Sequence, residues 1–148
     1  DSSYTYNSGG DRYLYGASFG KDGLRIFDCK KDKFIRTIST ASAQGSAIDG
    51  GRLYYLVTNG EKDYTKIYSA SRSGADRKPV LEGLPYNTWV DVISKDYICY
   101  RINDELDGHI YMTATGEDRK LDQMAYQNYI KENPHGANIY TGSGILRG

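Results

Sequence analysis

The chain has 148 residues, which is enough for one domain with a hydrophobic core, and its 19 basic residues balance 19 acidic residues. Because neither charge dominates, we expect neither nucleic acid nor an anionic membrane surface as a partner. No apolar run approaches the roughly 18–20 residues that cross a bilayer, so membrane insertion is not expected either. The chain opens without a methionine, and we expect a processed protein or a piece of a longer one.

Tyrosine is the unusual component of the sequence, with 15 residues against 3 phenylalanines. A tyrosine suits a half-exposed β-strand because its ring is apolar and its hydroxyl can reach water. The 17 glycines and only 3 prolines fit a chain with many hairpins. The composition therefore favours β structure.

Short β-prone runs separated by polar turns follow one another along the chain. They fall into groups of four, which we name A, B, C and D in chain order. The first group covers residues 4–8, 12–16, 24–29 and 34–38, the second 44–48, 52–57, 65–70 and 78–82, and the third 88–93, 97–102, 109–114 and 119–124. A fourth group begins with residues 128–132 and 137–141.

The groups are imperfect copies of one unit. Residues 86–100 align with residues 126–140 without a gap. Residues 123–132 have mild helical propensity, but this alignment predicts that they continue the β repeat instead of forming a helix. One column of the B strands, which we expect to be part of the core, holds a tyrosine in every copy: Tyr15, Tyr55, Tyr100 and Tyr140.

Four-stranded antiparallel units with a period of about 40–45 residues are typical of β-propeller blades, because one blade cannot bury both faces alone. We therefore predict an all-β fold in a single domain, residues 1–148. Its units cover residues 4–40, 44–84 and 88–125, with a partial unit at 128–148. Propellers close with about four to eight blades. Three complete units and a partial fourth leave two alternatives, a fragment of a larger propeller or a small four-bladed ring.

One stretch carries a family resemblance. Residues 53–58, 66–70 and 73–78 resemble the class B (YWTD) repeat of low-density-lipoprotein-receptor propellers, and are also similar to bacterial extracytoplasmic propellers of unknown function. Tyr54 keeps the first position of the YWTD tetrapeptide, whereas Tyr55 replaces its tryptophan. The resemblance implies an extracytoplasmic bacterial protein whose blades form a platform for a partner.

The two cysteines, Cys29 and Cys99, lie in β-like runs two repeats apart. This separation argues against a disulfide between them. We expect two buried free thiols.

Two short motifs have a catalytic or metal-binding alternative. Residues 16–20 match G-x-S-x-G, but a strand follows where a nucleophile elbow needs a helix, so we interpret them as a hairpin loop. Asn103, Glu105 and Asp107 have the spacing that opens a calcium loop, but the closing acid is missing. We interpret this loop as a hairpin turn, with a cation site as the alternative. No cofactor or metal is expected.

The inner A strands hold the candidate ligand-binding residues. Trp89 and Tyr129 occupy one column of the repeat, Tyr86 lies just before Trp89, and Asp91 follows it on the same strand. Aromatic side chains near the central mouth of a propeller can stack on a sugar or grip a peptide. Packing between blades is the alternative for the aromatics, and a solvated channel residue is the alternative for Asp91.

From these patterns we expect a non-catalytic, extracytoplasmic binding module that recognises a protein or glycan partner. Two alternatives stay open. The chain can be a structural portion of a larger propeller without a ligand of its own, or the propeller part of a carbohydrate-active enzyme. Exposed blade faces would also permit self-association or completion by further blades.

Overall fold

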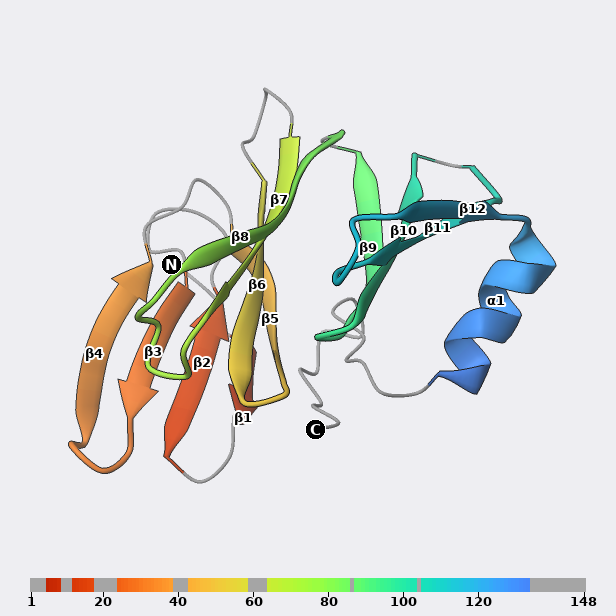
Figure 1. Ribbon diagram of the computed structural model, residues 1–148. Coiled ribbons are helices and arrows are strands. Elements are labelled where there is room, and N and C mark those ends of the chain that lie inside the picture. Colours follow the sequence, from red (N-terminus) through yellow and green to blue (C-terminus); the bar gives the residue numbers. More distant parts are fainter. Residues whose placement is uncertain are drawn as a thin grey trace.

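The computed structural model describes residues 5–8, 12–17, 24–38, 43–58, 64–85, 87–103 and 105–133. In these residues, twelve strands form three antiparallel sheets of four strands, and each sheet pairs its strands in chain order (Figure 1). The first blade contains β1 (Thr5–Ser8), β2 (Tyr13–Ala17), β3 (Leu24–Asp28) and β4 (Lys33–Ile38). The second contains β5 (Ala43–Asp49), β6 (Arg52–Thr58), β7 (Tyr64–Ala70) and β8 (Lys78–Pro85). The third contains β9 (Thr88–Ile93), β10 (Tyr97–Ile102), β11 (Gly108–Met112) and β12 (Asp118–Leu121).

This arrangement confirms the predicted four-stranded blades and the assignment of their strands. The tight hairpins have the residues that such turns need. Gly50 and Gly51 form the two-residue loop between Asp49 and Arg52, and both have positive φ, at 58° and 76°. Positive φ at both central residues gives a hairpin turn whose twist matches that of the flanking strands, and glycine adopts it without steric cost.

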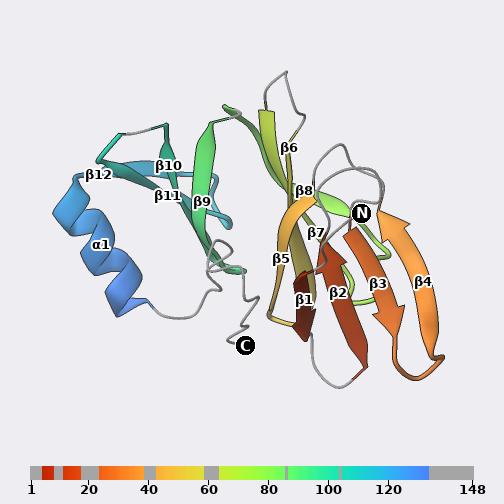
Figure 2. The same ribbon diagram turned by 180° about the vertical axis from the view of Figure 1, so that it is seen from behind.

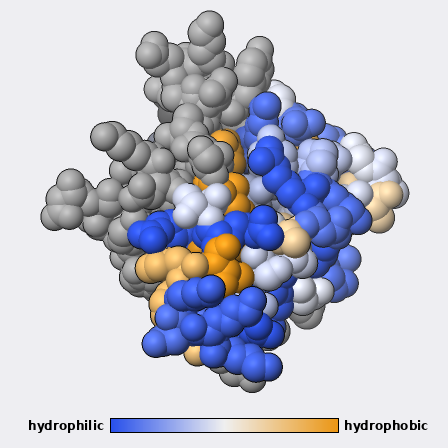
Figure 3. Space-filling model, turned by 90° about the vertical axis from the view of Figure 1, so that its left-hand side faces the viewer, coloured by the Kyte–Doolittle hydropathy of each residue, from blue (hydrophilic) through white to orange (hydrophobic). Residues whose placement is uncertain are grey.

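The core lies between the sheets, as expected for blades that stack on each other. One hydrophobic cluster joins the first and second blades, and a second cluster joins the second and third blades. A polar contact also links neighbours, because the buried carboxylate of Asp49 accepts a hydrogen bond from the backbone N–H of Lys95. The side of the molecule formed by the first two blades presents hydrophilic residues around a strip of hydrophobic ones (Figure 3).

The predicted tyrosine column is buried at Tyr15, Tyr55 and Tyr100, which confirms its place in the core, while Tyr140 lies outside the described residues. Tyr15 and Tyr55 belong to the same cluster, however, so they face each other across the first two blades. The reason is that the pairing of the B and C strands differs by one residue between the two blades. Tyr15 pairs with Ile26, whereas Tyr55 pairs with Tyr68 and not with Ile67. Because successive side chains on a strand alternate between faces, a shift of one residue reverses the direction of the side chain.

The chain continues after β12 into α1 (Gln123–Glu132), which lies beside the third blade (Figure 2). The prediction that residues 123–132 continue the β repeat was therefore wrong. The repeat alignment failed here because Asp122 caps the N-terminus of a helix. Its carboxylate accepts a hydrogen bond from the N–H of Ala125 at 2.9 Å. The same cap ends β12 at Leu121, before the predicted end of the strand at residue 124.

The spacing of apolar residues also favours the helix. Tyr126, Tyr129 and Ile130 are three and four residues apart and pack on the third blade as one face of α1. Residues 128–132, which were expected to start a fourth unit, are thus helical, and residues 137–141 lie outside the described residues. The helix covers part of the face of the third blade that points away from the second blade.

The cysteines are both free, as expected, but only Cys99 is buried. Cys29 is exposed, so the expectation of two buried thiols was wrong for this residue. The reason is local, because β3 ends at Asp28 and Cys29 opens the turn that leads to β4. The sequence predicted a strand that included residue 29, and this error placed the side chain of Cys29 in the sheet.

Candidate functional site

The candidate site lies on the face of the third blade that points away from the second blade. Successive side chains of β9 and β10 alternate between the two faces of the sheet. Val90 and Tyr100 pack in the cluster shared with the second blade. Trp89, Asp91 and Arg101 are therefore on the opposite face, which we call the outer face of the third blade.

Asp91 and Arg101 form the charged centre of this face. The guanidinium of Arg101 donates from Nε to Oδ2 of Asp91 and from Nη2 to Oδ1, both at 2.7 Å. Such a two-point pair between a fork of N–H groups and a carboxylate fixes both side chains in position. The Asp91 side chain is 16% exposed, so the pair is largely shielded from water. The hydrogen bond to Asp91 raises the pKa of Arg101, although burial acts in the opposite direction.

The hydroxyl of Tyr126 on α1 donates a second hydrogen bond to Oδ2 of Asp91, at 2.6 Å. Burial raises the pKa of Tyr126 well above its ordinary value, and the hydrogen bond to Asp91 adds to this effect. The phenol therefore stays protonated and acts as a donor. Asp91, which was expected to be a ligand-binding or solvated channel residue, is a junction between two strands and the helix.

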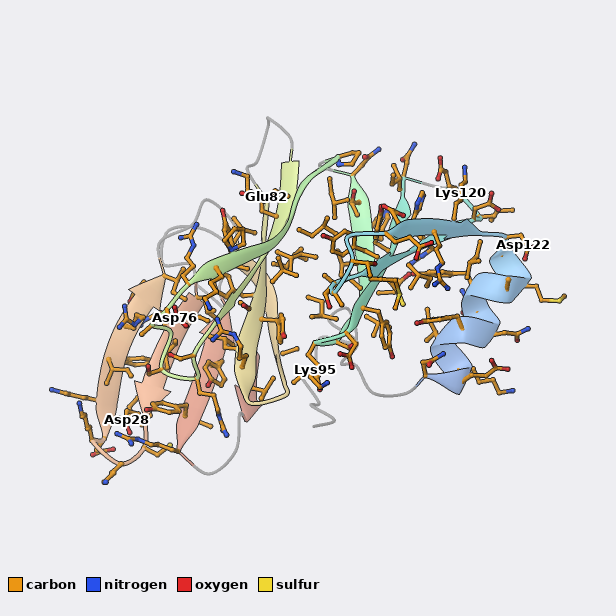
Figure 4. All side chains as sticks on the ribbon, in the orientation of Figure 1. Asp28, Asp76, Glu82, Lys95, Lys120 and Asp122 are labelled. Carbon is orange, nitrogen blue, oxygen red and sulfur yellow. The ribbon has the colours of Figure 1, made fainter. Side chains whose placement is uncertain are left out.

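Gly108 leaves room for the ring of Tyr126 because it has no side chain. A Cβ atom at Gly108 would lie 2.1 Å from the Tyr126 ring, so the ring rests directly on the backbone of β11. No other residue type allows this close approach without moving the helix. The helix begins next to β12 at Asp122 (Figure 4), which places Tyr126 one turn later over the sheet.

Trp89 is the exposed member of the outer face, with 50% of its surface accessible to water. It pairs directly with Arg101 across β9 and β10, and it is two residues before Asp91 on the same face. Side chains directly opposite each other in an antiparallel pair have Cβ atoms about 4.5–5.5 Å apart. The arrangement places a large aromatic surface beside a fixed ion pair on two regular strands.

Tyr129, the other predicted aromatic of this column, lies elsewhere. Its ring packs edge-to-face on Tyr97 with 5.4 Å between the ring centres, at the start of β10, whereas Trp89 lies opposite the end of that strand. The hydroxyl of Tyr97 donates to the backbone oxygen of Asn133 after the helix. Tyr129 therefore has the packing role that was the alternative for it, and Tyr86 lies outside the described residues.

Cys99 lies beneath α1 in the cluster that joins the third blade to the helix. Burial raises the pKa of its thiol to about 12. A thiol in this environment is protonated at neutral pH and is a poor nucleophile.

The loop of Asn103, Glu105 and Asp107 does not gather its acids around one point. Glu105 lies 3.8 Å from Nε2 of His109, and Asp107 lies 4.0 Å from the ammonium of Lys120. Asn103 has a positive φ of 55° and donates its backbone N–H to Asn87. Within the described ranges, no group of three or more acidic, histidine or cysteine side chains has the geometry to hold a metal ion.

Three side chains meet on the opposite face of the third blade, where Tyr100 packs towards the second blade. The ring of His109 stacks on Tyr100, with 4.7 Å between ring centres, and its Nδ1 lies 3.2 Å from Asp118. The hydroxyl of Tyr100 donates to the same carboxylate. Burial and this hydrogen bond raise the pKa of Tyr100. The carboxylate of Asp118 thus joins the B, C and D strands of the blade.

The first two residues of the G-x-S-x-G motif, Gly16 and Ala17, end β2, which pairs antiparallel with β3. A strand therefore follows the motif, as predicted, while Ser18 itself is outside the described residues. Among the residues that the structure describes, no helix has the length and apolar character needed to cross a membrane.

Sequence reasoning missed Arg101 and Tyr126. The signal for Arg101 was present, since an acid on the A strand and a base on the adjacent B strand fall on one face when the strands are paired. Tyr126 was missed because its segment was predicted as strand, and its contact with Asp91 depends on the helix.

No family model matches the sequence, and no curated protein is significantly similar to it. Solved structures are similar to its fold. The β-propeller domain of Cps50 (Swd1) from Myceliophteria thermophila superposes with a TM-score of 0.60 at 15% identity, over 82% of this chain and 41% of that chain. A chain of the nidogen/laminin complex gives a TM-score of 0.42 at 13% identity, over 78% of this chain and 61% of that chain.

At these identities the first of these similarities concerns the fold alone. This chain spans less than half of the Cps50 propeller domain and less than two thirds of the matched chain in the nidogen/laminin complex. The three stacked, four-stranded antiparallel sheets are therefore blades of the β-propeller type.

Proposed function

We propose that this chain is a non-catalytic binding module that holds a protein or glycan partner on the outer face of the third blade. The observation that carries the proposal is the half-exposed Trp89 opposite Arg101 and beside Asp91. Propeller blades commonly serve as rigid platforms for partners, which fits this use of the fold.

The chemistry of the face suits such a partner. An exposed indole can cover the apolar face of a sugar ring or a side chain of a peptide, and it loses little conformational entropy when it does so. The Arg101 side chain, 36% exposed, can hydrogen-bond to hydroxyl or carbonyl groups beside the indole. Its position is already fixed by Asp91, which lowers the cost of ordering it on binding.

A binding role is favoured over catalysis by the partners of the acidic side chains. Glycoside hydrolysis needs two carboxylates on either side of a bond, about 5–9.5 Å apart. Asp91 is occupied by Arg101 and Tyr126, and Asp118 is occupied by Tyr100 and His109. These contacts support structural roles for both acids.

A second candidate is a structural portion of a larger propeller, and a specific surface favours it. On the first blade, Leu14, Phe27 and Phe34 pair side by side across three strands on the face away from the second blade. The Phe27 and Phe34 rings meet edge-to-face at 5.1 Å, and Phe34 is 39% exposed. Among the described residues no other sheet packs on this face, where the guanidinium of Arg25 lies 3.8 Å from the centre of the Phe34 ring. A further blade, from a longer chain or another copy, would cover it.

The proposal includes an extracytoplasmic location in a bacterium, which rests on the resemblance of residues 53–58, 66–70 and 73–78 to YWTD-type propellers. Fractionation of the native host, with the protein located by antibody, tests this part. Recovery in the cytosol alone would contradict it.

The binding role is tested with a printed glycan array and a display library of random peptides, probed with the wild-type chain and with Trp89→Ala. We expect specific ligands for the wild type and loss of most of the signal in the variant, with unchanged thermal stability because Trp89 is half-exposed. Leu106→Ala, which also truncates an exposed apolar side chain of the third blade, is the matched control and should bind like the wild type. Equal binding by Trp89→Ala would rule out this face.

A further inference from the structure

A pocket of about 390 Å³ lies between the first and second blades, away from the outer face of the third blade. It is bounded by the end of β4 and by the turn that joins β7 to β8. Arg36 and Ile38 line it from the first blade, and Tyr55, Gly74, Asp76 and Arg77 line it from the second. Asp76 in Figure 4 marks the turn where it crosses the first blade, and Figure 3 shows this side of the molecule. The volume falls within the range of about 300–1,000 Å³ of small-molecule sites.

The turn is held firmly against the first blade. The backbone oxygen of Arg72 accepts a hydrogen bond from Tyr15 at 2.6 Å, and that of Ser73 accepts one from Nε of Arg36 at 3.1 Å. Gly74 has a φ of +91°, and a Cβ atom there would lie 2.5 Å from the Arg36 side chain. The pocket is therefore built by contacts that connect two blades, and its walls are fixed in position.

Tyr55 supplies an unpaired polar group to this pocket. Its side chain is fully buried, and its hydroxyl has no hydrogen-bond partner among the residues that the structure describes. A buried hydroxyl without a partner costs about 1–3 kcal/mol, so its presence calls for an explanation. Burial raises the pKa of Tyr55, against the effect of the nearby Arg77, and the hydroxyl is a donor at neutral pH.

The charge around the pocket favours an anion. The guanidinium of Arg77 lies 3.8 Å above the ring of Tyr68, and Arg36 contributes a second positive charge. Within the part of the chain that the structure describes, neither arginine forms an ion pair with an acid. The lining acid, Asp76, already faces Arg52 at 3.4 Å and Lys78 at 3.8 Å. The pocket therefore has positive charge in excess.

We propose that this pocket binds an oxyanion, the carboxylate or phosphate group of a small ligand. The hydroxyl of Tyr55 donates to the anion, and Arg36 and Arg77 neutralise its charge. This site is independent of the binding role proposed for Trp89, so either can fail without the other.

Isothermal titration with three probes tests the site: glucuronate, inorganic phosphate and neutral glucose. We expect glucuronate or phosphate to bind and glucose not to bind, with affinity that falls as salt is raised because the partners are charged. Binding of only one anion identifies which source the site prefers. Binding of neither anion, or equal binding of glucose, would overturn the proposal.

Two variants locate the binding. Tyr55→Phe removes only the hydroxyl and should weaken the anion by about tenfold or more, since hydrogen bonds to charged groups are the strong ones. Arg77→Gln should weaken it as well, and it provides a second test that leaves Tyr55 in place. Arg119→Gln, an exposed arginine on the third blade, is the matched control and should bind like the wild type. Loss of binding in the control, or none in both pocket variants, would place the anion elsewhere.

Discussion

Tyr126 of α1 donates its hydroxyl to Asp91 of β9 at 2.6 Å, and this hydrogen bond fastens the helix to the inner strand of the third blade. The acceptor is a carboxylate that also holds Arg101, so one acid connects three elements. The helix thereby buries part of the outer face of the third blade, including the free thiol of Cys99.

Tyr126→Phe should lower the free energy of unfolding by about 1.5–3 kcal/mol, because it removes a hydrogen bond to a charged acceptor while it keeps the ring. Urea denaturation followed by circular dichroism measures the change. Tyr55→Phe is the matched control, because its hydroxyl has no hydrogen-bond partner among the described residues and its removal should not destabilise the protein. Equal destabilisation by the two variants would show that the contact with Asp91 carries no stability.

Gly108→Ala should displace α1, since the new methyl group would overlap the ring of Tyr126. Overpacking of this kind costs about 1–3 kcal/mol. The accessibility of Cys99 reports the displacement directly. In the wild type, a thiol reagent should modify exposed Cys29 quickly and Cys99 slowly, because burial raises the pKa of Cys99 to about 12. In Gly108→Ala, Cys99 should react faster, and an unchanged rate would contradict the proposed contact.

Asp28 should make the first blade less stable at low pH. Its side chain is 1% exposed and accepts hydrogen bonds from Nε and Nη2 of Arg12 at 3.0 and 2.9 Å. The hydrogen bond from Arg12, with smaller contributions from the N–H groups of Lys30 and Lys31, lowers the pKa of Asp28 from 3.8 to about 2. Because the folded value lies below the unfolded value, this stabilisation is complete above pH 4 and is lost as the pH falls from about 4 to 2.

Thermal melting between pH 5 and pH 2 measures this dependence. Asp28→Asn should flatten the loss of stability in that window, because the titrating group is gone. Asp32→Asn is the control in the same turn, since Asp32 is exposed and asparagine tolerates its positive φ of 55°. It should keep the slope of the wild type. A slope that is equal in Asp28→Asn and the wild type would show that another acid is responsible.

The apolar face of the first blade should drive association. We expect the mass in solution, measured by light scattering after gel filtration, to rise above that of one chain as the concentration increases. Phe34→Glu places a charge on this face and should return the protein to a monomer. Leu106→Glu adds the same charge to an exposed site on the third blade and should not change the mass. A wild type that stays monomeric throughout would argue against docking on this face.

Much of the fold was predictable because it repeats. Each blade must bury two faces, so the same alternation of apolar residues recurs, and its period locates the strands. Predictions from the repeat were wrong where a local feature of the sequence favoured another structure. Asp122 caps a helix in a segment that aligns with strand residues, and the phase shift of one residue turns Tyr15 towards Tyr55.

The candidate site was less predictable than the strands. Trp89 and Asp91 were recognisable as side chains of an inner strand, but their neighbours depend on tertiary contacts. Arg101 reaches Asp91 only when A and B strands pair in this register, and Tyr126 reaches it only from a helix. The pocket at Tyr55 depends on how two blades meet, and no spacing within one blade encodes that contact.

The most direct test of the binding role uses Trp89 as its own reporter, because it is the only tryptophan in the chain. Its fluorescence is measured during titration with a ligand found on the glycan array or in the peptide library, together with its quenching by iodide. If the partner covers the indole, the emission shifts to shorter wavelength and quenching falls as the ligand saturates. Emission and quenching that stay unchanged at saturation would show that the partner binds elsewhere and would contradict the proposed site.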